Sequence, residues 1–163
     1  MKTQAPFWKL FKPKACSVGL KAKDPAQLPA ELIQNLVKAS LLEPEQAEAA
    51  VAAIESREQL ASTGVGQGVA IPHVQLAGLD KAVVSLALHK QGVDWRAIDG
   101  APVNLFFVVL RPAEATDDYD PERHLEMMRW ISRLARHDDF RRFALGVGTR
   151  TDLVNLLKEM AEV

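Results

Sequence analysis

The sequence has 163 residues, 48% of them hydrophobic, and carries a formal net charge of -1 at pH 7. This length and composition predict one globular domain whose core needs no disulfide or metal for its stability. The longest apolar runs are too short to cross a membrane as a helix, and no secretory signal peptide is evident, so we expect a cytoplasmic protein without stable membrane insertion. The single cysteine, Cys16, fits a reducing compartment, and we expect an inert, half-buried thiol.

The amino-terminal part of the chain differs in charge from the rest. Residues 1–24 are predicted to form a basic arm or first strand ahead of a domain at residues 25–163. The arm contains six lysines: Lys2, Lys9, Lys12, Lys14, Lys21 and Lys23. Together with Phe7, Trp8 and Phe11 this charge would suit an anionic membrane or a nucleic acid, but we favour packing of the aromatic rings on the domain. Because the remaining residues carry a negative excess, we expect no nucleic-acid partner.

Two helices are predicted in the first half of the domain. Leucine and isoleucine recur at helical spacing in residues 25–39, and Pro29 is expected to move the start of this helix a few residues later. Residues 44–57 begin with a proline, have acids in the first turn and continue with good helix formers. They predict a second helix, which ends at the glycine-rich stretch that follows.

Three strands are predicted after that stretch. Residues 69–71 are a short candidate and residues 82–88 a clear one. Residues 102–110 are almost entirely apolar, which is typical of a central strand covered on both faces. Asp99 and Gly100 supply turn chemistry before this strand.

The carboxyl-terminal part predicts two further helices. Residues 121–137 form the more convincing one, with Asp120 as its cap. Its buried stripe is expected to consist of Leu125, Met128, Ile131, Leu134 and Ala135. The last helix is predicted to start near Thr151, and its apolar face to consist of Leu153, Leu156, Leu157 and Met160. Strands interspersed with helices predict an α/β fold in a single domain, with helices on both faces of one sheet.

The segment STGVGQGVAIPH, residues 62–73, places three glycines ahead of a histidine that follows a proline. Backbone amides next to glycines can approach an anion closely, which suggests phosphate. The spacing is GxGxG rather than GxGxxG, and no lysine–serine or lysine–threonine pair follows it. The segment also precedes a strand instead of leading from a strand into a helix, so a nucleotide-binding loop is poorly supported.

The alternative is a phosphoryl group carried by His73 itself. A neutral imidazole is a good nucleophile toward phosphorus, and the N–P bond keeps enough energy for the group to be passed on. Pro72 restricts the backbone beside the ring. Ser62, Thr63 and glycine-flanked amides such as that of Gly64 are candidate donors to the phosphoryl oxygens; the alternative for Ser62 and Thr63 is that they only cap or turn the chain. Neutral donors suit a carrier, because tight binding would trap the group.

Three segments carry a resemblance to a known family: SREQLASTGVGQGVAIPH, WRAIDGAPVNLFFVVLRPAE and HLEMMRWISRLARHDDFRR. Over residues 25–162 the sequence resembles the type-2 enzyme IIA domains of the bacterial phosphoenolpyruvate-dependent phosphotransferase system. These are the domains of the mannitol/fructose and nitrogen-regulatory kind. The resemblance implies a mixed β-sheet with helices packed on both faces.

The resemblance also implies site residues. His73 corresponds to the phosphorylated histidine, Arg57 to an active-site arginine, and His124 to a second histidine that lines the site without being phosphorylated. The predicted place of His124 in the first turn of its helix supports this assignment, because free amides and the helix dipole favour an anion there. Arg57 would neutralise charge during transfer. The alternative for both Arg57 and His124 is a purely structural role at a helix end.

Two departures from the family pattern are visible. Val74 follows the active histidine where the family commonly has glycine, and the loop EATDDYDPER before His124 is longer and more acidic than usual. Neither departure removes a chemical group, so we interpret both as tuning the choice of partner.

The other polar residues predict no second chemistry. A metal site would need further ligands beside the two histidines, and no ligand motif has the required spacing, so neither a metal nor another cofactor is expected. His89 and His137 are expected to be structural. A solvated face is predicted for four arginines: Arg123, Arg129, Arg133 and Arg136.

Two classes of function follow from the resemblance. The first is a phosphocarrier whose donor is HPr or an HPr-like protein and whose acceptor is an enzyme IIB. The second is a regulatory module whose docking to a target protein depends on phosphorylation of His73. No IIB-like cysteine segment or membrane portion is evident in the sequence, so transport would need separate partners, and stand-alone chains of this family are often regulators. Both classes stay open at this point.

Overall fold

The computed structural model describes residues 5–162; residues 1–4, with Lys2 of the predicted basic arm, and residue 163 lie outside the described residues. The elements follow the order η1 (Phe7–Leu10), η2 (Pro13–Ala15), α1 (Leu28–Lys38), α2 (Pro44–Leu60), β1 (Gly64–Gly66), β2 (Val69–Ala70), β3 (His73–Leu76), β4 (Val83–Val93), β5 (Val103–Pro112), α3 (Pro121–Ala135), α4 (Asp138–Gly146) and α5 (Arg150–Glu159). None of the helices within residues 5–162 has the length and the apolar character that crossing a membrane would need.

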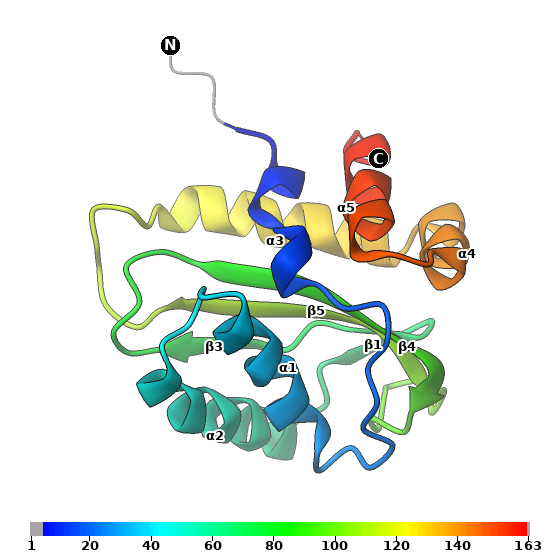
Figure 1. Cartoon of the computed structure of the whole chain (residues 1–163), viewed down its shortest axis with the longest axis horizontal. Coiled ribbons are helices and arrows are strands. Elements are labelled where there is room, and N and C mark those ends of the chain that lie inside the picture. The colour runs from blue at the N-terminus through cyan, green and yellow to red at the C-terminus, as the bar shows by residue number, and fades with distance from the viewer. Residues whose placement is uncertain (1–4, 163) are drawn as a thin grey trace.

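Strand β5 lies at the centre of a mixed sheet (Figure 1). Along one edge it pairs in parallel, first with β2, where Val69 faces Leu105, and then with β3, where His73 faces Val109. Along its other edge it pairs antiparallel with β4, and β1 extends the sheet by pairing antiparallel with β2. The prediction of a central strand at residues 102–110 is therefore confirmed.

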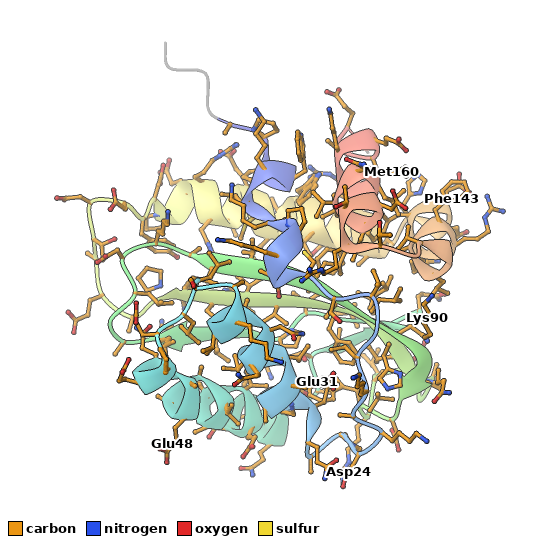
Figure 2. The ribbon with its side chains drawn as sticks, viewed as in Figure 1. Asp24, Glu31, Glu48, Lys90, Phe143 and Met160 are labelled. Carbon is orange, nitrogen blue, oxygen red and sulfur yellow. The ribbon has the colours of Figure 1, made fainter. Side chains whose placement is uncertain are left out.

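Helices cover both faces of this sheet. Figure 1 shows α1 and α2 on one face and α3 and α5 on the other. Because neighbouring residues of β5 point to opposite faces, Phe106 and Val108 join the core under α1 and α2. Phe107 and Val109 join the core under α3 and α5. Side chains fill the space between these layers (Figure 2), and the predicted α/β fold with helices on both faces is confirmed.

Predicted helix starts agree with the local hydrogen bonding. The side chains of Glu43 and Gln46 form a capping box at the start of α2. The carboxylate of Asp120 accepts from the amide of Glu122 at 3.0 Å and caps α3, as predicted. Helix α5 begins close to its predicted start, and the hydroxyl of Thr149 caps it.

The buried stripe of α3 differs from the prediction in the first half of the helix. Leu125 is 52% exposed, and Met128 is half-buried. The residues of α3 that are buried are His124, Met127, Trp130, Ile131, Leu134 and Ala135. A pattern of apolar residues cannot include a buried histidine, so it placed the stripe one residue out of register at this end.

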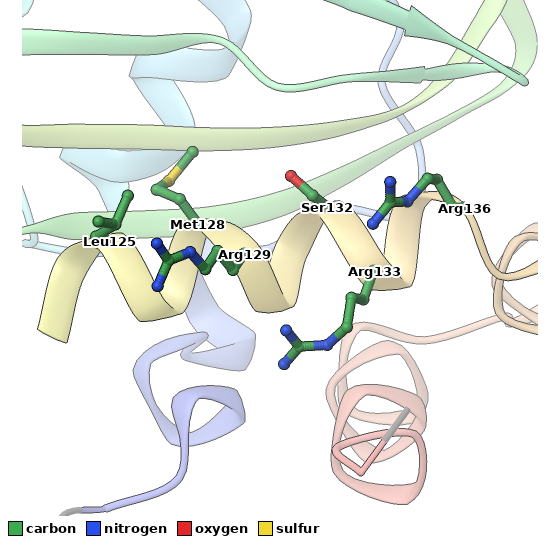
Figure 3. Close-up of a pocket in the computed structure, with 6 residues that line it drawn as sticks. All are labelled: Leu125, Met128, Arg129, Ser132, Arg133 and Arg136. Atoms are coloured by element: carbon green, nitrogen blue, oxygen red, sulfur yellow. The ribbon is translucent and has the colours of Figure 1, made fainter.

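Leu125 and Met128 instead border a hollow on α3 (Figure 3). The other residues around this hollow are Arg129, Ser132, Arg133 and Arg136. Arg129, Arg133 and Arg136 are exposed, as the prediction of a solvated face requires. Arg123 is the exception, because it is half-buried and binds the amino-terminal arm.

Residues 138–146 form a helix, α4, that the sequence analysis did not assign. The Nδ1 atom of His137 accepts from the amide of Phe140 at 3.4 Å and caps this helix, so the predicted structural role of His137 is confirmed. Phe140 and Ala144 are its buried residues. Two buried positions in a helix of nine residues make too short a stripe for apolar spacing to reveal.

The described part of the amino-terminal arm packs on the domain. Phe11 is 1% exposed, and its ring centre lies 6.2 Å from that of Phe107 and 5.9 Å from that of Trp130. The ring of Phe7 also contacts Trp130, at 5.8 Å between centres. The favoured prediction that the aromatic side chains of the arm pack on the domain is confirmed.

The arm is held at further points. The guanidinium of Arg123 lies 3.8 Å from the ring centre of Phe7 and donates to the carbonyl of Ala5 at 2.6 Å. Within residues 5–24 the arm joins the sheet through an isolated bridge at Ser17 rather than a strand. Cys16 is 2% exposed, more buried than predicted, and burial raises the pKa of its thiol to about 11, which keeps it inert. The boundary between arm and domain stays a prediction.

Phe11 is expected to be essential for stability although it lies in the arm. Phe11→Ala should lower the free energy of unfolding by about 3 to 5 kcal/mol, because it empties a buried aromatic site. The neighbouring Leu10 is 46% exposed, so Leu10→Ala is a matched control that should stay within about 0.5 kcal/mol of the parent protein. Urea denaturation of the two variants checks this, and equal effects would contradict the packing described here.

Candidate functional site

Pro72 separates two short strands and determines where His73 lies. Proline has no amide hydrogen, so β2 ends before it and β3 begins with His73. The carbonyl of Pro72 still accepts from the amide of Val109 at 2.8 Å, which keeps this backbone tied to β5. His73 then pairs opposite Val109, and its half-buried ring lies on the face that α3 covers.

The residue after His73 points the other way. Val74 is 8% exposed and belongs to the core under α1 and α2. It does not face a partner that docks over His73, so the interpretation of Val74 as tuning partner choice is wrong. This valine contributes to core packing beneath the site. For the acidic loop before α3, the same interpretation stays a prediction.

His73 meets His124 across the space between the sheet and α3. The two Nε2 atoms are 3.0 Å apart, and the ring centres are 5.1 Å apart. His124 lies one turn after the cap of α3 and is 9% exposed. The ring of Tyr119 packs edge-on against that of His124, with 5.3 Å between the centres. The structure thus brings together the two histidines that the sequence analysis selected.

Both rings are held neutral near pH 7. Burial is the main cause that lowers the pKa of His73 to about 4, followed by electrostatic interactions with His124, Arg111 and Arg57. Burial also lowers the pKa of His124, with a smaller contribution from Arg111. A hydrogen bond between two neutral rings needs one Nε2 to donate and the other to accept. One of the two histidines therefore has a lone pair at Nε2, and this lone pair accepts the hydrogen bond from the other ring.

Arg57 and Glu58 lie near the end of α2. The guanidinium of Arg57 donates to the carbonyl of Ala61 at 2.6 Å, and its charge is among the causes, after burial, that lower the pKa of His73. The carboxylate of Glu58 accepts from the amide of Thr63 at 3.1 Å and from its hydroxyl. The end of α2 is thereby tied to the start of the glycine segment.

The hydroxyls of Ser62 and Thr63 are used inside the protein. Ser62 donates to the carbonyl of Trp95 at 2.9 Å and accepts from the amide of Gly64 at 3.0 Å. Thr63 donates to Glu58 and accepts from the indole N–H of Trp95 at 3.0 Å. To donate to a phosphoryl oxygen, the hydroxyls of Ser62 and Thr63 and the amide of Gly64 would each have to break the hydrogen bond that they now donate. The assignment of Ser62, Thr63 and Gly64 to phosphate stays a prediction.

The glycines build a tight hairpin between β1 and β2. Gln67 and Gly68 have φ values of 59° and 78°, as the two-residue turn that matches strand twist requires. A Cβ on Gly64 would lie 2.7 Å from the Cβ of Ala97, so this position needs glycine. The amide of Gln67 already donates to Asp99 at 2.9 Å. The bare backbone therefore serves the hairpin that returns the chain to β5.

Arg111 and Gln75 are neighbours of the site that the sequence analysis did not select. They face each other in the register between β3 and β5. With its amide oxygen turned toward the guanidinium, Gln75 accepts from both terminal nitrogens of Arg111, at 2.7 and 3.1 Å. A cation at the end of a largely apolar strand is the signal that could have identified Arg111.

Other polar groups lie outside this site. His89 is 3% exposed, its Nε2 lies 2.9 Å from the carbonyl of Ala22, and its Nδ1 accepts from the amide of Gly92 at 3.0 Å, so its predicted structural role is confirmed. The hollow on α3 in Figure 3 contains none of the candidate site residues. In the part of the chain that the structure describes, no group of three or more histidine, cysteine or carboxylate side chains is placed to hold a metal ion.

Comparisons with known proteins agree with this architecture. A model of the EIIA 2 family of the phosphoenolpyruvate-dependent sugar phosphotransferase system matches residues 9–160. A nitrogen regulatory protein of Pseudomonas aeruginosa is 43% identical over 112 residues, which are 68% of each chain. A fructose-specific EIIA component of Haloferax volcanii is 34% identical over 115 residues, which are 71% of each chain.

A solved structure is also similar over almost its whole length. The crystal structure of the nitrogen regulatory protein IIA-Ntr from Neisseria meningitidis has a TM-score of 0.76 and 27% sequence identity, covering 92% of this chain and 97% of that one. The fold and these comparisons define a component of the phosphotransferase system. Within that system, the chain belongs to the EIIA type-2 family, and the predicted resemblance is confirmed.

The neutral histidines make stability depend on pH. The pKa of His73 is lower in the folded protein, about 4, than its ordinary value of 6.5, so the unfolded chain takes up a proton first as the pH falls. The contribution of a neutral His73 is complete above about pH 6.5 and is lost progressively toward pH 4. We expect the free energy of unfolding to fall over this window, and His73→Gln to reduce that fall. Urea denaturation at several pH values measures both slopes, and identical slopes in the two proteins would refute the lowered pKa.

Thr63 is expected to stabilise the end of α2. Thr63→Val removes a hydroxyl that serves Glu58 and the buried indole of Trp95, so the free energy of unfolding should fall by about 1 to 3 kcal/mol. Thr151 is an exposed threonine in α5, and Thr151→Val is the matched control. Thermal and urea unfolding check the difference. A loss no larger than that of the control would mean that these bonds do not stabilise the fold.

Proposed function

We propose that this chain is a phosphohistidine carrier that works in the cytoplasm. It accepts a phosphoryl group from HPr or an HPr-like protein on His73 and passes it to a IIB-type acceptor. The observation that carries this proposal is the pair of neutral imidazoles whose Nε2 atoms are 3.0 Å apart, in a chain of the EIIA type-2 family. His73 rather than His124 receives the group, because His73 is half-buried whereas His124 is 9% exposed.

The proposed transfer needs no proton to move when the donor ring carries a hydrogen on its other nitrogen, because that ring then leaves as a neutral imidazole. His124 donates from its Nε2–H, and His73 carries its hydrogen on Nδ1 and a lone pair on Nε2. The Nε2–H of His124 first turns away from His73, which frees this lone pair to attack phosphorus in line with the donor nitrogen. As the new N–P bond forms, the old one breaks and its electron pair returns to the donor ring. The Nε2–H of His124 then donates to a phosphoryl oxygen.

Arg57 supports this transfer by its charge. Its contact with the carbonyl of Ala61 uses one of the five guanidinium hydrogens, which leaves donors for the phosphoryl oxygens. Ser62, Thr63 and Gly64 remain proposed phosphate ligands, although their present hydrogen bonds favour a supporting role at the end of α2. No metal, nucleotide or organic cofactor takes part in this scheme.

A regulatory role is the second candidate. The relative in Pseudomonas aeruginosa is named a nitrogen regulatory protein and is 43% identical over 112 residues. A phosphoryl group on His73 would add about 1.5 to 2 negative charges beside half-buried side chains, enough to make or break a docking surface. In this case the chain binds a target protein in one phosphorylation state only.

Intact-mass spectrometry tests the carrier chemistry. The purified chain is incubated with phosphoenolpyruvate, enzyme I and HPr of the same organism. A single acid-labile phosphoryl adduct is expected on the parent protein, none on His73→Ala, and formation about 100-fold slower on His124→Ala, which lacks the proposed donor. His137→Gln, which alters a helix cap far from the pair in the sequence, is the control and should label at the parental rate.

A second step separates the two candidate roles. Loss of the adduct on mixing with a IIB protein, with the same adduct appearing on IIB, identifies a carrier. Capture of a target by only one of the two phosphorylation states, without transfer, identifies a regulator. No adduct on the parent protein would overturn the carrier proposal and leave a module that acts by binding alone.

A further inference from the structure

Arg111 shares a face of the sheet with His73. It follows Val109, the strand partner of His73, by two residues. Side chains two residues apart in a strand point to the same face, so Arg111 and His73 both lie on the side that α3 covers. The two positions are separated by about 7 Å along the strands, within reach of an arginine side chain.

The charge of Arg111 acts on both histidines. After burial, it is the cause that lowers the pKa of His124. It also contributes to the lowered pKa of His73, after burial and the ring of His124. This effect on two rings whose Nε2 atoms are 3.0 Å apart agrees with the place of Arg111 on the face of the sheet that α3 covers.

The positive charge of Arg111 has no anionic partner. Its guanidinium is half-buried and is held by the neutral amide of Gln75. Within residues 5–162 no carboxylate forms an ion pair with it. Part of its hydration is already lost, and its planar fork of donors matches the oxygens of a phosphoryl group. The guanidinium can therefore bind an anion that comes from outside the protein.

We propose that Arg111 is a catalytic residue whose guanidinium binds the outer oxygens of the phosphoryl group as that group passes to and from His73. This rests on the proposed function above. The N–P bond of the donor breaks as the bond to His73 forms, and the negative charge stays on the three outer oxygens throughout. Arg57 approaches this charge from α2, and Arg111 approaches it from β5.

Gln75 positions the guanidinium of Arg111. Its amide oxygen receives two of the five N–H groups and fixes the plane of the fork, which leaves three donors for phosphoryl oxygens. Gln75→Met keeps the charge of Arg111 but removes its orientation. The loss caused by Gln75→Met should therefore be smaller than the loss caused by Arg111→Gln.

The experiment measures labelling of His73 by phosphoramidate, a small donor with the same N–P chemistry, beside labelling by phosphorylated HPr. Intact-mass spectrometry at alkaline pH follows the adduct with time. Arg111→Gln should slow labelling by both donors about 10- to 100-fold, less than the loss of a fully buried donor because Arg111 is only half-buried. Arg111→Lys should fall between Arg111→Gln and the parent protein. Arg142→Gln, an arginine with 71% of its side chain exposed on α4, is the control.

A spectroscopic measurement separates contact from a structural role. Phosphorus NMR of the phosphorylated proteins gives the pKa of the phosphoryl group, which should be higher in Arg111→Gln because a nearby cation is lost. A purely structural arginine would leave this titration unchanged.

Each outcome decides between the proposals. Parental labelling by both donors and an unchanged phosphorus titration in Arg111→Gln would overturn the role of Arg111 and leave the carrier proposal standing. Slower labelling by HPr alone would also overturn it, since Arg111 would then contact the partner protein rather than the reacting group. A parent protein that takes no phosphoryl group from either donor overturns both proposals.

Discussion

The parallel pairing of β3 with β5 is the interaction on which the rest of the site depends. The carbonyl of Pro72 holds the amide of Val109, so His73 begins a new strand at one defined register. Alternation along that strand then sends His73 toward α3 and Val74 into the opposite core. A shift by one residue would exchange them, burying the imidazole under α1 and α2 and exposing a valine to partners. His124 can contact His73 only in the register that pairs His73 with Val109.

Much of the fold was predictable because its signals are local. The apolar run at residues 102–110 indicates a strand covered on both faces, and Asp120 followed by a proline indicates a helix start. The glycine segment before His73 indicates the family. These features depend on residues close together in the sequence, which is why pattern and resemblance were sufficient to identify them.

The features that were not predicted depend on pairing between distant segments. The hydroxyl of Thr63 has a partner in Trp95, and Gln75 has one in Arg111, but neither pair shares a local pattern. The buried place of His124 was missed for a different reason, since apolar periodicity treats every histidine as a surface residue. His124 is both a polar site residue and a buried one, so a prediction that assigns polar residues to the surface is wrong at this position.

The first turn of α3 serves two connections through adjacent residues. His124 contacts His73 on the sheet. Arg123 contacts the amino-terminal arm at the ring of Phe7 and at the carbonyl of Ala5. Tension applied to the arm is delivered to the turn that carries the second histidine. A tether at that end of the chain, or a surface that holds it, thus has a mechanical route to the histidine pair that involves no docking over the pair itself.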